Sequence, residues 1–167
     1  MTSPPKTLLI IWHSRTGGAR AMARAAAKGA ASEPTAQVRV LSATKATVSD
    51  LLAADAYLFV TPENLATMSG AMKEFFDRTY YPALGALNGR PYAAMICAGS
   101  DGEGAARQLA RIAQGWRLKP IAKTLIIKTN AQTPTQILAK KTISAADLRL
   151  CHDTGAALSA GLALGIF

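Results

Sequence analysis

The sequence is poor in cysteine, and this scarcity bears on two kinds of site. Only Cys97 and Cys151 occur among 167 residues. Neither belongs to a Cys-x-x-Cys pair or to a cluster of cysteines and histidines, so the sequence offers no candidate metal site. A chain of this length can bury a substantial core without disulfides. We therefore expect two reduced, structural thiols.

Long hydrophobic runs are also absent. No segment approaches the roughly 18 to 20 consecutive apolar residues that are needed to span a bilayer. The stretch Met1–Lys6 contains two prolines and a lysine and lacks the apolar centre of a secretory signal. We therefore expect no membrane partner and a cytoplasmic location.

Acidic residues are scarce relative to basic ones. There are 10 Asp and Glu residues against 19 Lys and Arg, which gives a formal charge of +9 at pH 7. The basic residues are scattered, only Lys140 and Lys141 are adjacent, and no aromatic residues alternate with them as in a surface that stacks nucleic-acid bases. A solvated basic face explains this pattern better than nucleic-acid binding, so we expect no nucleic-acid partner. An electron carrier that docks on a basic partner would be acidic, and this chain is not.

Apolar runs alternate with amphipathic segments five times along the chain. The runs predict strands at residues 7–12, 37–41, 56–61, 91–98 and 122–128. The amphipathic segments predict helices at residues 19–31, 48–54, 69–80, 105–118 and from 144 onward, with a polar loop and one helical turn in 129–142. This alternation predicts a single α/β domain over residues 1–167, a flavodoxin-like three-layer sandwich. Its five-stranded parallel sheet would have the order 2-1-3-4-5, with helices on both faces.

In this strand order, the loops after strands one, three and four surround one crevice. The first loop, residues 13–18, leads directly into a helix, whose unpaired N–H groups suit an anion such as phosphate. An ordinary strand-to-helix turn, in which hydroxyl groups only cap the helix, explains this loop equally well. Neither a Walker A loop nor the Gly-x-Gly-x-x-Gly dinucleotide motif is present there.

Three segments resemble known flavoproteins. Ser14-x-Thr16-Gly17 resembles the phosphate loop of flavodoxins and flavodoxin-like reductases, in which a further Ser or Thr usually stands where this chain has Ala19. Thr61-Pro62-Glu63-Asn64 resembles the Pro-Glu-Tyr-Asn loop of NADPH-dependent FMN reductases, with the tyrosine missing. Residues 68–77 resemble the corresponding segment of tryptophan-repressor-binding-type NAD(P)H:quinone oxidoreductases, and the similarity extends over residues 8 to about 118.

The resemblance implies one noncovalently bound FMN, held by three groups of residues. The residues implied at the phosphate are Ser14, Arg15, Thr16, Gly17, Gly18 and Ala19. The residues implied along the isoalloxazine ring are Pro62, Glu63, Asn64, Leu65 and Met68. The residues implied at the pyrimidine edge of the ring are Ala98, Gly99, Ser100 and Gly102. A solvated loop charge explains Glu63 equally well, and a plain connector is the alternative for the loop at residues 99–104.

The activity that the resemblance implies is an NAD(P)H-dependent oxidoreductase. NADPH or NADH would donate a hydride to the flavin, and a quinone or another small acceptor would receive the electrons. No catalytic side chain is required, because the cofactor carries the chemistry. The resemblance also implies a homodimer or homotetramer. Two alternatives stay open: a flavodoxin-type electron-transfer protein, and a flavin-free flavodoxin-like interaction module.

Overall fold

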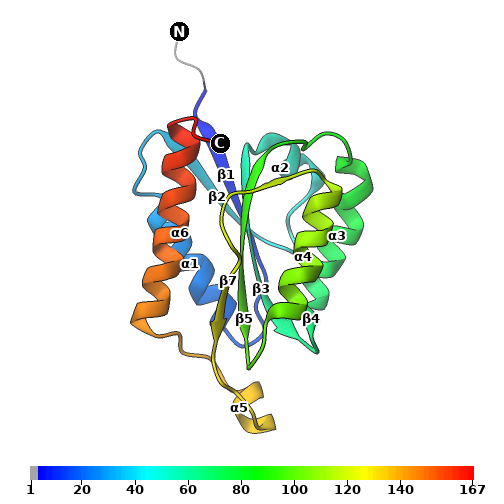
Figure 1. The fold of residues 1–167 in the computed structure, drawn as a ribbon, viewed down its shortest axis with the longest axis vertical. Helices are drawn as coiled ribbons and strands as arrows, with labels where there is room; N and C mark the ends of the chain where they lie inside the picture. Colours follow the sequence, from blue (N-terminus) through cyan, green and yellow to red (C-terminus); the bar gives the residue numbers. More distant parts are fainter. Residues whose placement is uncertain (1–3) are drawn as a thin grey trace.

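A computed structural model describes residues 4–167; residues 1–3, which begin the stretch Met1–Lys6, lie outside it. The sheet contains the parallel strands β2 (Ala36–Ser42), β1 (Lys6–Trp12), β3 (Ala56–Asn64) and β5 (Pro91–Ala98), in that order (Figure 1). Two short strands, β6 (Lys119–Pro120) and β7 (Leu125–Lys128), pair with the two ends of β5. The predicted order 2-1-3-4-5 is confirmed, with β6 and β7 together in the fifth position.

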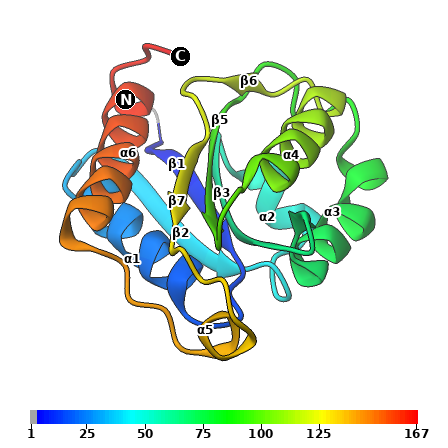
Figure 2. The same ribbon diagram turned by 60° about the horizontal axis from the view of Figure 1, so that its bottom comes forward.

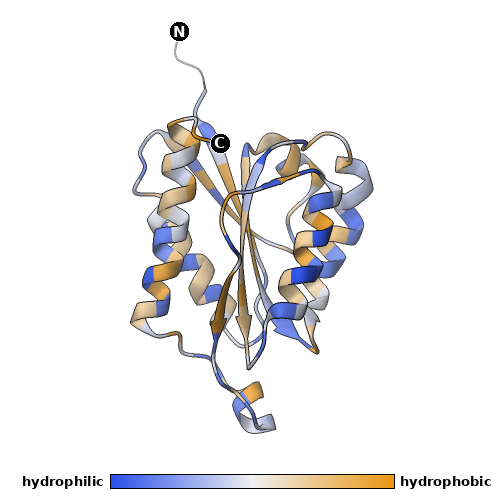
Figure 3. Cartoon of the chain, in the orientation of Figure 1, coloured by the Kyte–Doolittle hydropathy of each residue, from blue (hydrophilic) through white to orange (hydrophobic). Residues whose placement is uncertain are grey.

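Helices cover both faces of this sheet, as predicted (Figure 1). One face carries α1 (Gly18–Ala30) and α6 (Ala145–Ala163), and the other carries α2 (Val48–Ala53), α3 (Gly70–Ala83) and α4 (Glu103–Gly115). The sheet is mostly hydrophobic at its centre, and the helices carry both hydrophobic and hydrophilic residues (Figure 3). Successive strand residues point to opposite faces. Leu8 and Ile10 therefore pack against α1 and α6, while Leu9 and Ile11 belong to the core under α2, α3 and α4.

The fifth strand and the third helix differ from the prediction. The predicted strand at residues 122–128 is shorter than expected: β7 begins at Leu125, and residues 121–124 separate it from β6, which was not predicted. A two-residue strand that was not predicted, β4 (Thr67–Met68), pairs antiparallel with the end of β3. Helix α3 continues through Pro82, where a proline in the last turn removes only one backbone hydrogen bond.

The segment after β7 contains a helix in a different place from the predicted turn. We expected a turn at residues 137–141, whereas α5 spans Pro134–Leu138. Thr133 and Gln136 form a capping box at its start, and Pro134 follows the cap, a favourable first helical residue. Helix α5 lies beyond the carboxyl ends of β5 and β7, away from the two layers of helices (Figures 1 and 2).

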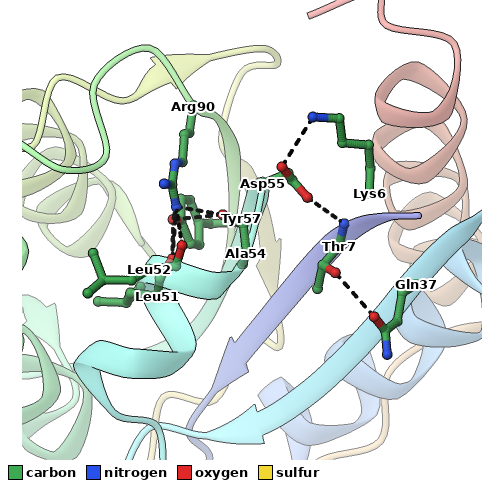
Figure 4. A network of polar contacts seen from close by, with 9 residues as sticks. All are labelled: Lys6, Thr7, Gln37, Leu51, Leu52, Ala54, Asp55, Tyr57 and Arg90. Carbon is green, nitrogen blue, oxygen red and sulfur yellow. Dashed lines mark hydrogen bonds and ion pairs between the residues drawn. The ribbon is translucent and has the colours of Figure 1, made fainter. Parts of the chain in front are cut away.

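A polar network fixes the opposite edge of the sheet, where the strands begin (Figure 4). Asp55 accepts hydrogen bonds from the Thr7 N–H and from Lys6. Arg90 donates to the carbonyl oxygens of Leu51, Leu52 and Ala54 at the end of α2, and to the hydroxyl of Tyr57. These bonds satisfy carbonyl groups that the end of a helix leaves unpaired. The loops at the carboxyl ends of the strands are therefore the ones left to form a site.

Candidate functional site

A cavity of about 480 Å³ lies at the carboxyl edge of the sheet. This volume is within the range of roughly 300 to 1,000 Å³ that is typical of small-molecule sites. All three predicted loops contribute to it, as does the segment that carries α5. Its lining consists of Ser14, Arg15, Thr16, Gly18 and Ala19; Pro62, Glu63, Asn64 and Leu65; Cys97, Ala98, Gly99 and Ser100; and Thr129, Ala131, Ile137, Leu138 and Lys141.

Loop 1, residues 13–18, brings the start of α1 to this cavity. Gly17 is the N-cap residue, with φ of 94°, and no side chain of the described chain caps the helix. The first-turn N–H groups of α1 therefore have no side-chain acceptor, and they carry the partial positive charge of the helix end. The hydroxyl of Ser14 is turned back into the loop, where it accepts a hydrogen bond from the Gly17 N–H at 3.0 Å.

The second predicted loop is a β-hairpin. Strands β3 and β4 pair through Glu63–Met68 and Asn64–Thr67, and a two-residue turn joins them. Both turn residues have positive φ, 52° at Leu65 and 63° at Ala66, as a type I′ turn requires. Leu65 is 99 % exposed at the tip. The hairpin thus presents an uncovered apolar side chain at the mouth of the cavity.

Glu63 is neither a free loop charge nor an open ligand. Its carboxylate accepts hydrogen bonds from the Gly102 N–H at 2.9 Å and the Ala105 N–H at 3.1 Å. It therefore occupies the N-terminus of α4 and ties the hairpin to that helix. Glu63 thus supplies acceptors at the start of α4, whereas the start of α1, also on the cavity wall, has no side-chain acceptor. The sequence did not show this difference between the two helices, because Glu63 is about 40 residues away from α4 along the chain.

Three of the predicted site residues do not line the cavity. Gly17 and Gly102 lie behind it, as the positive-φ N-cap residues of α1 and α4. Met68 is 2 % exposed and packs in the core under α3 and α4. The pairing of β4 with β3 reverses the chain after Leu65 and directs Met68 away from the cavity. The structure therefore places Met68 with the core residues Met72 and Phe75.

The α5 segment, residues 129–143, supplies lining that sequence reasoning missed. Thr129 and Asn130 N–H groups donate to the carbonyls of Ala98 and Gly99, which holds the segment beside the third loop. Ile137 and Leu138 are 51 % and 77 % exposed and line the cavity. The signal that could have been used is the apolar pair itself, in a stretch that we predicted to be a polar loop with one helical turn.

Two titratable groups near the cavity are held in their neutral forms. Burial raises the pKa of the Cys97 thiol to about 11, so this cavity residue is not a nucleophile at neutral pH. Burial and the nearby charge of Arg15 lower the pKa of His13, whose Nδ1 lies 2.8 Å from the Ser69 hydroxyl. Both cysteines are free and buried. Residues 4–167 contain no group of three His, Cys, Asp or Glu residues that could hold a metal ion.

The donor groups of this cavity fit a flavin nucleotide. The Asn64 side-chain nitrogen is buried and has no hydrogen-bond partner among residues 4–167. A buried, unpaired donor is costly and indicates an acceptor on a bound molecule. Beside it are the open N-terminus of α1 for an anion, and the aliphatic side chains of Leu65, Ile137 and Leu138 for an apolar ring. The lining within the described chain includes no aromatic residue.

Comparisons with known proteins find a family and a relative with similar sequences. The sequence model of the NADPH-dependent FMN reductase family matches residues 32–132, which include the hairpin and the third loop but not loop 1. A flavodoxin of Aquifex aeolicus (strain VF5) is 34 % identical over 97 residues, which are 58 % of this chain and 52 % of that protein. The chain thus matches about half the length of this relative.

Solved structures with the same fold include an archaeal flavodoxin and a WrbA-like protein. The archaeal flavodoxin has a TM-score of 0.75 at 20 % identity, over 93 % of this chain and 98 % of its own. The WrbA-like protein from Agrobacterium tumefaciens has a TM-score of 0.67 at 20 % identity, over 96 % of this chain and 98 % of its own. These likenesses confirm the flavodoxin-like fold. Because the family model covers more than half of the sequence, the chain belongs to the NADPH-dependent FMN reductase family.

Proposed function

We propose that this protein binds FMN in the cavity and acts as an NAD(P)H-dependent oxidoreductase. The observation that carries the proposal is the unpaired Asn64 nitrogen on the wall of a cavity that also contains the uncapped start of α1. Membership of the FMN reductase family supports the cofactor. When bound, FMN would supply the redox chemistry, taking a hydride from NADPH or NADH and passing electrons to a quinone or another small acceptor.

The side chains of this protein would bind and orient the cofactor and would not transfer protons. Loop 1 would hold the phosphate with backbone N–H groups, because a helix N-terminus favours an anion. Asn64 would fix one polar edge of the ring through its side-chain N–H. Leu65, Ile137 and Leu138 would cover apolar parts of the ring and reduce its contact with water. In this arrangement the mouth beside Leu65 is the side from which a nicotinamide or an acceptor would approach.

A flavodoxin-type electron carrier is the second candidate. The 34 % identity to a protein named flavodoxin favours it. The formal charge of +9 favours the reductase over a carrier that docks on a basic partner, because like charges would repel. Both candidates require the same cofactor. They differ in whether a nicotinamide alone reduces the protein.

The test is a flavin titration of the purified protein, followed by anaerobic addition of NADPH or NADH. The reductase proposal expects FMN uptake and bleaching of the flavin absorption band by at least one of the two donors. Uptake without bleaching by either donor would favour the carrier. No uptake of FMN would refute both candidates and would leave the flavin-free interaction module.

A matched pair of variants tests whether the unpaired Asn64 side-chain nitrogen contributes to FMN binding. Asn64→Ala removes the unpaired donor, and we expect FMN binding to weaken roughly two- to tenfold, the value of one hydrogen bond. Asn88→Ala makes the same change on the exposed connector before β5, at the opposite edge of the sheet, and should leave the Kd unchanged. Equal Kd values for FMN in the two variants would show that the Asn64 side chain does not bind FMN.

A further inference from the structure

The α5 segment crosses loop 1 and packs against the first residue of α1. The Lys141 N–H donates to the Thr16 carbonyl at 2.8 Å. A Cβ on Gly18 would lie 3.3 Å from the Lys141 Cβ and 2.5 Å from the Cys97 Sγ. Only a glycine fits there, so the backbone of Lys141 is held at the N-terminal end of α1.

The charge of Lys141 is also fixed in place. Its Nζ donates to the carbonyl oxygens of Gln136, Ile137 and Ala139, at 2.9, 2.8 and 2.6 Å. Within the described chain, no carboxylate lies within 4.0 Å of this ammonium group, so its charge is not compensated by an ion pair. The Lys141 charge acts on a residue that lines the cavity: it lowers the pKa of Cys97 and so partly offsets the rise that burial causes.

A phosphate group beside loop 1 would have few side-chain donors from that loop. Ala19 has no hydroxyl, and the contact in which the Ser14 oxygen accepts from the Gly17 N–H orients the Ser14 hydroxyl but leaves its O–H free to donate. The donors of this loop are the first-turn N–H groups of α1, the hydroxyls of Ser14 and Thr16, and the guanidinium of Arg15, whose side chain is exposed. Apart from Arg15 these donors are neutral, whereas a phosphate monoester carries close to two negative charges at neutral pH. A nearby cation would contribute more than a further hydroxyl.

We propose that Lys141 is the counter-charge for the phosphate of the bound flavin nucleotide and makes the site selective for FMN over riboflavin. This inference rests on the proposed function, because it assumes that the cavity binds a flavin. The cation comes from the α5 segment, outside the three loops that sequence reasoning identified. It acts in the place where Ala19 leaves loop 1 one donor short.

The experiment measures the Kd of the apoprotein for FMN and for riboflavin by flavin titration, at low and at moderate salt. The quantity of interest is the ratio of the riboflavin Kd to the FMN Kd. Lys141→Met should lower this ratio about tenfold, because it removes the attraction between the ammonium charge and the phosphate. It should also reduce the salt dependence of FMN binding, because salt screens a charge pair. Lys141→Arg should retain most of the ratio.

The control variant is Lys123→Met, which removes the same charge from the exposed connection between β6 and β7 and should change neither Kd. Lys141→Met could also disturb α5, whose carbonyls bind Nζ, but that damage would weaken riboflavin and FMN binding together. An unchanged ratio in Lys141→Met, with FMN still bound, would overturn the inference and leave the proposed function intact. If the wild-type protein binds neither flavin, the proposed function fails, and the inference fails with it.

Discussion

Leu65 and Ala66 occupy a backbone conformation that L-residues with a Cβ adopt at a cost. Their φ values of 52° and 63° suit Asn and Gly, the residues preferred in a type I′ turn. Each non-glycine residue in this region costs about 1 kcal/mol or more. Strain of this kind is retained where the side chain serves the site. Leu65 lines the cavity and Ala66 does not, so the two residues can be separated by mutation.

We expect Leu65→Asn to stabilise the fold and weaken flavin binding. The variant relieves the backbone strain, and about 1 kcal/mol would raise the Tm by roughly 2–4 °C for a chain of this size. It also removes the apolar side chain from the mouth of the cavity. Ala66→Gly is the control: it should raise the Tm similarly and leave the Kd for FMN unchanged. A Leu65→Asn variant that binds FMN as tightly as the wild type would show that Leu65 makes no contact with the ring.

His13 links loop 1 to the N-cap residue of α3. Its Nδ1 lies 2.8 Å from the Ser69 hydroxyl, which also accepts from the Met72 N–H. Burial, followed by the charge of Arg15, lowers the pKa of His13 below its usual value of 6.5. Below pH 6.5 the unfolded chain therefore binds a proton at this position more readily than the folded protein does. The contribution of neutral His13 to stability is present above pH 6.5 and is lost as the pH falls through the lowered pKa.

We expect His13→Gln to reduce the loss of thermal stability on acidification. The measurement is the Tm from about one unit above pH 6.5 to about two units below it. Wild-type protein and the His152→Gln control, changed on the partly exposed face of α6, should both lose stability faster than His13→Gln across this range. Parallel curves for all three proteins would exclude His13 as a source of acid sensitivity.

The hairpin and α4 act as one element because of Glu63. The Glu63 carboxylate accepts hydrogen bonds from two N–H groups at the start of α4. The Met68 N–H also donates to the side chain of Gln108 in α4, at 2.9 Å. The turn of the hairpin packs so closely on α4 that a Cβ on Gly104 would overlap the Ala66 carbonyl. Glu63→Gln keeps the shape and loses one acceptor and the charge. We expect it to lower the free energy of unfolding by about 1 kcal/mol, the usual value of a helix cap, and to weaken FMN binding because the hairpin is less well held.

The control for this change is Glu103→Gln, which removes a carboxylate from the first turn of the same helix at an exposed position. A loss of the general attraction to the helix dipole would affect both variants alike. Thermal unfolding and the Kd for FMN, measured side by side, distinguish the two. If Glu103→Gln matches Glu63→Gln in both measurements, the bridge between the hairpin and α4 does not contribute.

Most elements could be predicted from the sequence because their signals are local. Continuous apolar runs identified β1, β3 and β5, and the order of the strands placed three loops around one cavity. The role of Glu63 and the position of Lys141 were not predictable in this way, because each depends on a contact between distant segments. Met68 was assigned to the ring by resemblance, and the antiparallel pairing of β4, which no local pattern indicated, directs it into the core.

The protein has two hydrophobic cores, one on each face of the sheet. The cavity lies at the carboxyl edge of the sheet, where both cores end. One core includes Met22 and Leu158 from α1 and α6, and the other includes Phe76 and Trp116 near α3 and α4. Loop 1 is attached to the first core, and the hairpin is attached to the second through α4. A molecule bound across the cavity therefore contacts parts of both cores. Residues 4–167 contain no helix that is long and apolar enough to cross a membrane.

Because the cavity exists only when both cores are folded, we expect FMN to stabilise the entire fold. A ligand that binds only the folded state adds about 2.7 kcal/mol at roughly 100 times its Kd. For a chain of this size each kcal/mol raises the Tm by roughly 2–4 °C, so saturating FMN should raise it by roughly 5–10 °C. The measurement is one cooperative transition, followed at several FMN concentrations. Riboflavin at the same concentrations should raise the Tm less, because it lacks the phosphate that the start of α1 would bind. A second transition that FMN does not shift would show that one core unfolds independently of the site.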